Sequence, residues 1–177
     1  MNIVVYGAGG VGGFFGGKLA KAGFDVTFVA RGETLLSIKQ NGLKVKSIEG
    51  DFKVFPKVTD NIQDISNPDL IILAVKSWQI EAIAEKLKDI ITEDTMVLPL
   101  QNGADNADRL RAILPKNNVL AGLCKIVSKI ESPGVISHFE YEPQIILGEF
   151  DNAKTERMQL LKSIFDKAGF KNKRAEN

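Results

Sequence analysis

The sequence predicts a doubly wound α/β fold around a mostly parallel sheet. Short apolar runs rich in β-branched residues alternate with segments of helical periodicity, and the runs are apolar at consecutive positions. Consecutive apolar residues are typical of strands buried on both faces, as in parallel sheets. Strands that alternate with helices then pack as strand–helix–strand units with right-handed crossovers.

Composition excludes several classes of protein. The 177 residues are 44% hydrophobic and 25% charged, and 23 Lys and Arg against 22 Asp and Glu leave a net charge of +1. This balance provides no basic field for nucleic acid. The apolar run at residues 70–75 is far shorter than the ~20 residues of a membrane helix. One cysteine and one histidine exclude an internal disulfide and a histidine-rich metal site. We expect a cytoplasmic domain with no metal, nucleic-acid or membrane partner.

Strand and helix signals alternate through the first half of the chain. Gly23 and Gly42 stand where helix C-terminal caps belong. Residues 43–46 and 52–55 alternate apolar with polar side chains, which predicts a half-exposed hairpin. In chain order we expect strands at residues 3–6, 25–30 and 69–75, and helices at residues 10–22, 33–41 and 80–91.

The second half continues this alternation, with prolines and a glycine at the ends of elements. Pro99 lies at the end of a strand, and Pro115 and Gly169 each follow a helix. The remaining expected elements are strands at residues 96–98 and within 118–127 and 134–147, and helices at residues 106–114 and 154–168. Ligands of such sheets bind at the carboxyl ends of the strands.

A glycine-rich turn follows the first strand directly. Gly7, Gly9 and Gly12 form Gly-x-Gly-x-x-Gly at the head of an amphipathic helix, the context in which this motif indicates dinucleotide binding. Gly7 permits the tight turn, Gly9 lets the backbone approach a pyrophosphate, and Gly12 lets the helix lie close on the sheet. The N–H groups and dipole of the helix start favour the anion. A glycine-rich turn without a ligand is the alternative.

Arg31 stands at the end of the second strand, where NAD-binding domains usually carry an acid for the ribose 2′-hydroxyl. A guanidinium matches a 2′-phosphate in geometry and charge. A charge-assisted contact of ~1.5–3 kcal/mol corresponds to about a 10- to 150-fold preference. NADPH is therefore the expected cofactor. Two interpretations compete: Glu33 serves an NAD ribose or begins the next helix, and Arg31 is a solvated surface charge.

Two polar residues follow the next two strands. Lys76 leaves a buried strand before a helix, which would place its ammonium at the rim of the cofactor site. The alternative is a capping turn with Ser77 as N-cap and Trp78 in the core. Asn102 follows the later strand, and its amide can donate and accept hydrogen bonds beside Gly103, which leaves room for a ligand. An Asn-Gly turn without a role is the alternative.

Four segments together resemble one known family, the ketopantoate reductases (2-dehydropantoate 2-reductases). The segments are Gly7-Ala8-Gly9-Gly10-Val11-Gly12, Ala30-Arg31, Val75-Lys76-Ser77-Trp78-Gln79 and Leu100-Gln101-Asn102-Gly103. The resemblance covers essentially the whole chain, in the order of the family. Many dehydrogenases share the glycine motif, whereas Lys-x-Trp-Gln and Gln-Asn-Gly are far more specific. The resemblance implies a Rossmann-type domain and NADPH-dependent reduction of ketopantoate to pantoate, on the route to pantothenate and coenzyme A.

The resemblance also implies roles for individual residues. Residues 7–12 would bind the pyrophosphate and Arg31 the 2′-phosphate. Lys76 would lie beside the adenosine ribose and phosphate or at the substrate entrance, and Asn102 beside both nicotinamide and substrate. Both are thus expected to bind the 2-oxo acid substrate as well as the cofactor. Reduction further needs a proton donor for the developing alkoxide.

The sequence departs from the family pattern in two places. Residues 123–128 replace a threonine-rich stretch beside the nicotinamide. The catalytic lysine of the family lies near a tryptophan in a second, helical domain, whereas Trp78 is the one tryptophan here, so Lys171 and Lys173 are not assigned that role. We expect residues 1–170 to be the dinucleotide-binding domain and residues 171–177 a solvated linker to an absent helical domain. The isolated chain should then bind NADPH but turn over little or no ketopantoate.

Two other functions stay open from the sequence. One is a non-catalytic NADP(H)-sensing module, and the other is a related NAD(P)-dependent dehydrogenase of another 2-oxo acid. Lys76 and Asn102 favour a reductase, since a sensor needs no substrate-facing amide. A face normally covered by a second domain also predicts a weak homodimer. Cys124 is expected as a small buried side chain and His138 as a sheet residue.

Overall fold

Five parallel strands form the central sheet of the computed structural model, which describes residues 1–103 and 105–175. Every neighbouring pair in this sheet is parallel. All the strands expected for it are confirmed, and β5 is an additional edge strand. The order across the sheet is β5 (Lys57–Thr59), β2 (Asp25–Val29), β1 (Asn2–Tyr6), β6 (Leu70–Leu73) and β7 (Met96–Pro99).

The central sheet is buried on both faces, which explains its consecutive apolar residues. In β1, Ile3 and Val5 pack into one core cluster, whereas Val4 and Tyr6 pack into the cluster on the opposite face. Successive side chains of a strand point to opposite faces, so a strand between two cores must be apolar throughout. The strand at the middle of the sheet therefore contributes equally to both cores.

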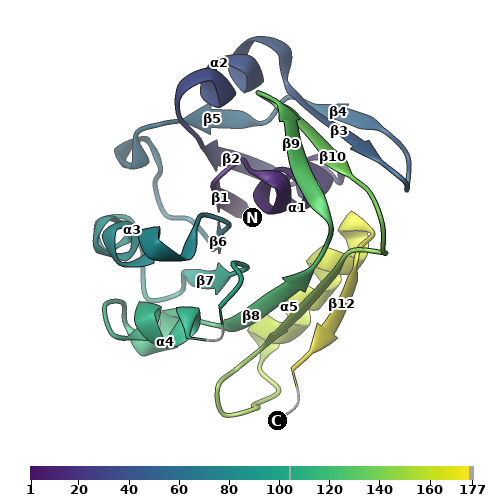
Figure 1. Ribbon diagram of the computed structural model, residues 1–177. Helices are drawn as coiled ribbons and strands as arrows, with labels where there is room; N and C mark the ends of the chain where they lie inside the picture. Colours follow the sequence, from purple (N-terminus) through teal and green to yellow (C-terminus); the bar gives the residue numbers. More distant parts are fainter. Residues whose placement is uncertain (104, 176–177) are drawn as a thin grey trace.

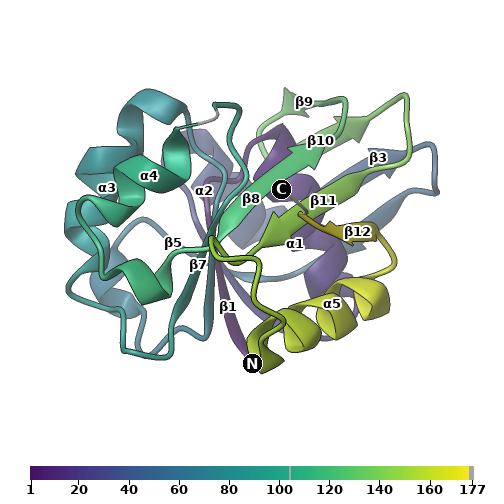
Figure 2. The same ribbon diagram turned by 90° about the horizontal axis from the view of Figure 1, so that it is seen from below.

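Helices and two smaller sheets cover the two faces. Figure 2 shows the central sheet between a layer of α3 and α4 and a layer that holds α1, α5 and the remaining strands. The doubly wound α/β class is thus confirmed. None of the helices in residues 1–103 and 105–175 is long and apolar enough to cross a membrane. The helices are α1 (Gly10–Lys21), α2 (Gly32–Asn41), α3 (Ile80–Leu87), α4 (Asn106–Arg111) and α5 (Glu156–Ala168).

The late strands build two small sheets instead of extending the central one (Figure 1). The antiparallel pair of β3 and β4 confirms the predicted hairpin, and β10 joins β3 in parallel and β9 in antiparallel. The expected strand regions 118–127 and 134–147 thus contain β8, β10 and most of β11, while β9 was not expected. The order is β4 (Phe52–Val54), β3 (Leu43–Ser47), β10 (Val135–His138) and β9 (Ser128–Ser132) in one sheet, and β12 (Lys171–Arg174), β11 (Gln144–Gly148) and β8 (Ala121–Lys125) in the other.

The expectation that a solvated linker begins after residue 170 is wrong, because residues 171–174 form the strand β12. β12 pairs in parallel with β11 over four residues. Gly169 ends α5 in the left-handed conformation, with φ +73°, and Phe170 is buried against the core beside it. The chain is thereby turned back along β11. Lys171 and Lys173 are exposed on β12, whereas Asn172 and Arg174 are half-buried; residues 176 and 177 lie outside the described part of the chain.

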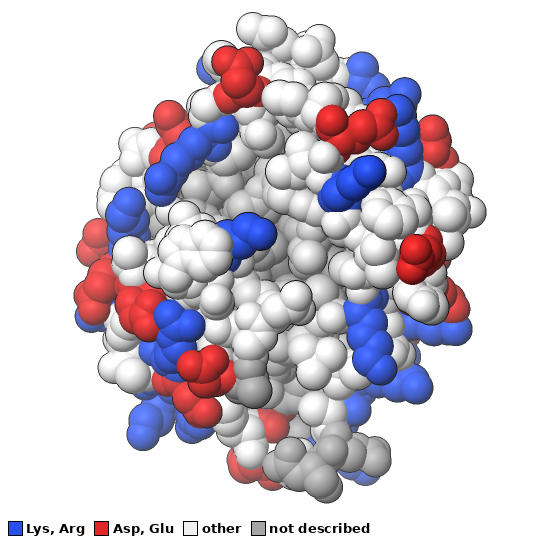
Figure 3. Space-filling view, in the orientation of Figure 1, with Lys and Arg blue, Asp and Glu red and all other residues white. Residues whose placement is uncertain are grey.

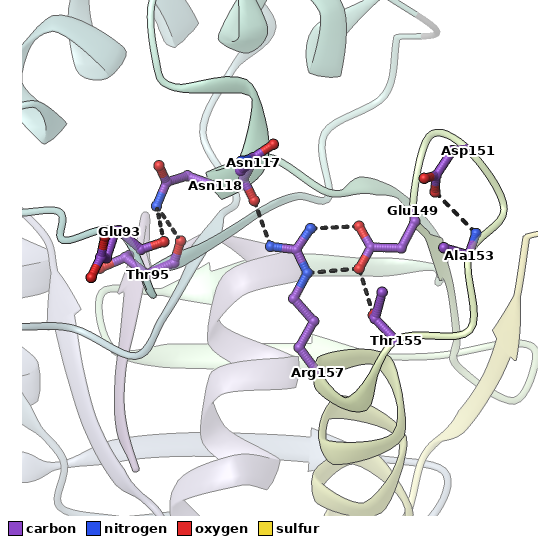
Figure 4. A network of polar contacts seen from close by, with 9 residues as sticks. All are labelled: Glu93, Thr95, Asn117, Asn118, Glu149, Asp151, Ala153, Thr155 and Arg157. Carbon is purple, nitrogen blue, oxygen red and sulfur yellow. Dashed lines mark hydrogen bonds and ion pairs between the residues drawn. The ribbon is translucent and has the colours of Figure 1, made fainter.

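A polar network holds the third sheet to the central one (Figure 4). Glu149, which is only 8% exposed at the end of β11, accepts two hydrogen bonds from Arg157 of α5 and one from Thr155. Arg157 also donates to the backbone oxygen of Asn117, and Asn118 donates to the backbone oxygen of Thr95 just before β7. The hydrogen bond from Arg157 lowers the pKa of Glu149. The carboxylate is therefore held in its charged form at the junction.

Candidate functional site

The carboxyl ends of β1 and β6 meet at a topological switch point. From β1 the chain passes through α1 to β2 on one side, and from β6 it passes through α3 to β7 on the other. In open α/β sheets, ligands bind in the crevice at this point. Two adjoining hollows lie here and share Gly9, Trp78, Gln79 and Ile130 as border residues. Figure 3 shows the face as hollowed at its centre, with Lys and Arg side chains on several sides.

The half of the groove beside β2 and α2 has a volume of about 500 Å³, and we call it the Arg31 hollow. Its floor is the glycine turn after β1, and its walls are the end of β2 and one face of α3. Besides the four shared residues, it is lined by Tyr6, Gly7, Ala8, Val29, Ala30, Arg31, Thr34, Ala82, Ile83 and Lys86.

The other half, of about 660 Å³, is the Asn102 hollow. It lies between the start of α1, the ends of β6 and β7, and β9, which packs against the start of α1. Besides the shared residues, it is lined by Gly10, Val11, Ala74, Val75, Lys76, Ser77, Leu100, Gln101, Asn102, Ile126, Ser128 and Lys129. Predicted site residues from four separate segments therefore meet along one groove.

The glycine turn has the geometry that the motif requires. Gly7 has φ +105°, and a Cβ atom there would lie 2.8 Å from the backbone oxygen of Ala74. A Cβ atom on Gly12 would lie 1.9 Å from the backbone oxygen of Gly7. These contacts bring α1 against the end of β6, as expected. Gly12 is a packing position and does not border the groove, unlike the other residues of the turn.

Gly9 is the glycine that faces open space. It is the N-cap of α1, and no heavy atom of the described residues lies within 4 Å of where its Cβ would be. In the same part of the chain no side chain caps α1, and the first turn of α1 contains no acidic residue. The first N–H groups of a helix have no partner within the helix. The start of α1 therefore presents backbone donors and a positive dipole end to the groove, which suits an anion.

Arg31 is the N-cap of α2 and reaches the hollow named after it. The side chain is exposed, and within residues 1–103 and 105–175 no side-chain hydrogen bond caps the helix that follows. Thr34 of the first turn of α2 borders the hollow, whereas Glu33 does not. Among the described residues that line the Arg31 hollow there is no Asp or Glu. The described lining of this half therefore carries positive charge. Such a lining fits the predicted 2′-phosphate site better than an NAD site, in which a carboxylate binds the ribose.

Lys76 lies at the Asn102 hollow, and the turn after it differs from the predicted cap. Lys76 itself is the N-cap of the 3₁₀ helix η2 (Ser77–Gln79), and its N–H donates to Oε1 of Gln79 at 3.2 Å. Trp78 is 73% exposed, so the alternative that placed it in the core is wrong. The core beneath is completed by Ile80, which is fully buried. An exposed indole at the junction of two hollows is available to a ligand.

Asn102 is exposed in the loop after β7, and a buried neighbour fixes that loop. Asn106, which is 2% exposed, donates through Nδ2 to the backbone oxygens of Gln101 (3.2 Å) and Asn102 (3.1 Å). Gly103 has φ +134°, a conformation that other residues rarely adopt. Asn106 is therefore a positioning residue for the loop that bears Asn102.

Two polar side chains at the Asn102 hollow have buried atoms that lack hydrogen-bond partners among the described residues. They are Gln101, whose Nε2 and Oε1 are both unpaired, and Ser128, whose Oγ is unpaired. Buried polar groups in folded proteins are nearly always hydrogen-bonded. Unpaired donors and acceptors from β9 and from the loop after β7 are thus concentrated at one end of the groove.

The sequence interpretation missed several lining residues, for different reasons. Lys86 follows Gln79 by seven residues, and Ala82 and Ile83 lie between them on the same helix face, so helical spacing could have found it. Lys129 and Ile130 carry no such signal, because β9 reaches the groove through pairing with β10, whereas Ile126 and Ser128 belong to the stretch that the family resemblance places beside the nicotinamide.

Cys124 and His138 lie outside the site, as expected. The Cys124 thiol donates to the backbone oxygen of Leu100 at 3.4 Å, and burial raises its pKa to about 11. His138 is buried in β10 and bonds the hydroxyl of Ser47 and the backbone oxygen of Tyr141. The protonated thiol of Cys124 and the imidazole of His138, both of whose nitrogens are hydrogen-bonded, are therefore structural groups and not acid–base groups of the groove.

Comparisons with known proteins agree on one family. A family model described as ketopantoate reductase PanE/ApbA matches residues 3–152. A 2-dehydropantoate 2-reductase of Nostoc sp. is 34% identical over 172 residues, which cover 93% of this chain and 53% of the relative. The chain thus spans about half the length of the curated relatives it matches.

Solved structures show the same similarity. The 2-dehydropantoate 2-reductase of Porphyromonas gingivalis W83 is similar with a TM-score of 0.94 and 31% identity, over 99% of this chain and 64% of that one. D-mandelate dehydrogenase, solved with NADH and anilino(oxo)acetate, has a TM-score of 0.89 and 25% identity, over 100% of this chain and 57% of that one.

Proposed function

This chain belongs to the ketopantoate reductase family, and from that premise we propose that it is the cofactor-binding part of an NADPH-dependent 2-dehydropantoate 2-reductase. When bound, NADPH supplies a hydride to the carbonyl carbon of the 2-oxo acid. Residues of this chain hold and orient the cofactor. The observation that carries the proposal is the positively charged groove at the switch point, with α1 amides in its middle and Arg31 at one end.

The residues present fit NADPH along the whole groove. The open space at Gly9 leaves room for a pyrophosphate against the first turn of α1. Arg31 and the uncapped start of α2 suit the 2′-phosphate. The nicotinamide carboxamide both donates and accepts hydrogen bonds, which the unpaired groups of Gln101 and Ser128 can satisfy. Asn102 and Lys76 then lie where the 2-oxo acid would meet the nicotinamide.

A second candidate is an NADH-dependent dehydrogenase of another 2-oxo acid. The similarity to D-mandelate dehydrogenase solved with NADH favours it. The charge of the Arg31 hollow favours NADPH, because NADH would bring no phosphate to Arg31. The choice between the two reactions therefore depends first on the cofactor.

The cofactor can be tested by titrating the chain with NADPH and with NADH, using Trp78 fluorescence and calorimetry. Trp78 is the one tryptophan and borders both hollows, so bound reduced cofactor should quench it. We expect NADPH to bind at least tenfold more tightly, and Arg31→Ala to remove about 10- to 150-fold of NADPH affinity while NADH affinity stays the same. Equal affinities in the unchanged chain would overturn the NADPH proposal.

The reaction can be tested by extending the gene downstream to the length of the relatives. We expect ketopantoate reduction with NADPH by the extended protein, and little or no turnover by the 177-residue chain. Turnover of ~10 per second by the 177-residue chain would contradict the expectation that it turns over little or no ketopantoate. An extended protein that binds NADPH but reduces neither ketopantoate nor other 2-oxo acids would instead support a sensing module.

A further inference from the structure

The Arg31 hollow contains a second cation, Lys86, that stands apart from the other charges of α3. Lys88 pairs with Glu85 and Arg109 pairs with Glu81 on the outer surface. Lys86 makes no ion pair with any residue in 1–103 or 105–175, and neither does Arg31. Two cations from different elements thus border a hollow whose described lining residues include no carboxylate.

The position of Lys86 on α3 directs its side chain toward the groove. Ala82 and Ile83 lie three and four residues after Gln79, and Lys86 lies four and three residues after them, so all four share one helix face and border the Arg31 hollow. Side chains of a helix lean toward its N-terminus. The N-terminus of α3 is the end at the carboxyl edge of the sheet, where the groove lies. Ala82, one turn before Lys86 on this face, has a small side chain and borders the same hollow.

We propose that Lys86 contacts the 2′-phosphate of NADPH from the side opposite Arg31 and is a second determinant of cofactor specificity. This inference rests on the proposed NADPH preference and adds a residue to it. A phosphate monoester carries a charge of about −1.5 to −2 at pH 7, so one guanidinium leaves much of it uncompensated. Arg31 and Lys86 together compensate this charge. With NADH bound, the two cations would border the same hollow without an anion between them.

The competing explanation is that Lys86 is only a solvated cation that stabilises the C-terminus of α3 through the helix dipole. Both explanations predict a small loss of stability on substitution. They differ in binding, because a dipole effect acts on all ligands alike, whereas a phosphate contact acts on 2′-phosphorylated ligands alone.

The test compares Lys86→Gln with the matched control Lys88→Gln, which removes a paired lysine two residues further on, at the C-cap of α3. Each variant is titrated by calorimetry with four ligands: NADPH, NADH, 2′,5′-ADP and 5′-ADP. We expect Lys86→Gln to weaken NADPH and 2′,5′-ADP by about tenfold and to change NADH and 5′-ADP by less than twofold. Lys88→Gln should change none of the four beyond twofold.

The outcomes separate this inference from the proposed function. If the unchanged chain prefers NADPH and Lys86→Gln keeps that preference, Lys86 has no role in specificity and the inference alone is wrong. An equal loss for all four ligands would also overturn it, in favour of the dipole explanation. If the unchanged chain binds NADPH and NADH equally, the cofactor preference itself fails, and the role of Lys86 fails with it.

Discussion

The two halves of the groove differ in what they offer a ligand. The Arg31 hollow combines two cations that have no ion-pair partner in residues 1–103 and 105–175 with the open backbone of a glycine turn. The Asn102 hollow combines amide and hydroxyl groups with lysines at its border, and three buried polar atoms of these groups lack partners in the described part of the chain. One half is thus suited to recognise phosphate charge, and the other a pattern of donors and acceptors. A dinucleotide with a phosphorylated ribose and a carboxamide has these two ends.

The two halves also depend on different parts of the fold. The Arg31 hollow is built mainly from β1, β2, α2 and α3, which belong to strand–helix units of the central sheet. The Asn102 hollow depends more on β9, which belongs to a separate sheet and returns over the start of α1: Ser128 and Lys129 line the Asn102 hollow, and Ile130 borders both hollows. We therefore expect substitutions to affect the halves separately, except in the turn and at the border residues that they share.

The largest effects are expected in that shared turn, where two glycines should respond in opposite ways. Gly12→Ala places a methyl group 1.9 Å from the backbone oxygen of Gly7, so we expect a loss of about 3 kcal/mol or more in the free energy of unfolding. Gly9→Ala meets no atom within 4 Å and should leave stability within about 0.5 kcal/mol. It should still weaken NADPH binding by at least about tenfold, because its methyl group fills the phosphate space.

Urea unfolding and calorimetry measure both quantities. If Gly9→Ala binds NADPH as tightly as the parent chain, the pyrophosphate does not bind at the start of α1. A stable Gly12→Ala chain would show that α1 can move away from the sheet without loss.

An effect of intermediate size is expected at Glu149, which holds the third sheet in place. Glu149→Gln removes the charge that accepts two bonds from Arg157, so unfolding should become easier by about 2–3 kcal/mol. The control Glu85→Gln removes an exposed partner of Lys88 and should cost at most about 0.5 kcal/mol. If urea unfolding gives the same loss of free energy of unfolding for both variants, the Glu149 network does not hold the third sheet in place.

The effect of Glu149 should also depend on pH. Its pKa is lowered in the folded protein, mainly by the bond from Arg157, so the unfolded chain binds the proton more readily. The stabilisation is therefore complete above the ordinary glutamate pKa of about 4.3 and is lost as the pH falls through the lower folded value. The difference between parent and Glu149→Gln should shrink below about pH 4. A difference that grows on acidification would contradict this sign.

The smallest effect is expected at Asn106, and it should be confined to the Asn102 hollow. Asn106→Ala removes the donor that holds the backbone oxygens of Gln101 and Asn102, at a cost of about 1–2 kcal/mol in stability. NADPH should bind a few-fold more weakly, while 2′,5′-ADP, which lacks the nicotinamide, should bind as before. Asp108→Ala, an exposed change on the same helix, should alter neither ligand. Equal losses for the two ligands would show that the halves are not independent.

How far the sequence predicts each half follows from the same difference. The motif residues Gly7, Gly9 and Arg31 stand next to the strands that carry them, so strand assignment alone placed them at the groove. Ile130 could not be placed, since its position depends on a strand pairing between distant segments. The strand character of Lys171–Arg174 was likewise hidden, because four polar residues become a strand only through pairing with β11.

The central claim is that NADPH lies along this groove with its 2′-phosphate at Arg31. The most direct measurement is a crystal structure of the chain grown with NADPH. We predict density for the pyrophosphate at the start of α1, for the 2′-phosphate against the Arg31 guanidinium, and for the nicotinamide in the Asn102 hollow. An empty groove at saturating NADPH, or a cofactor whose 2′-phosphate lies away from Arg31, would contradict the account.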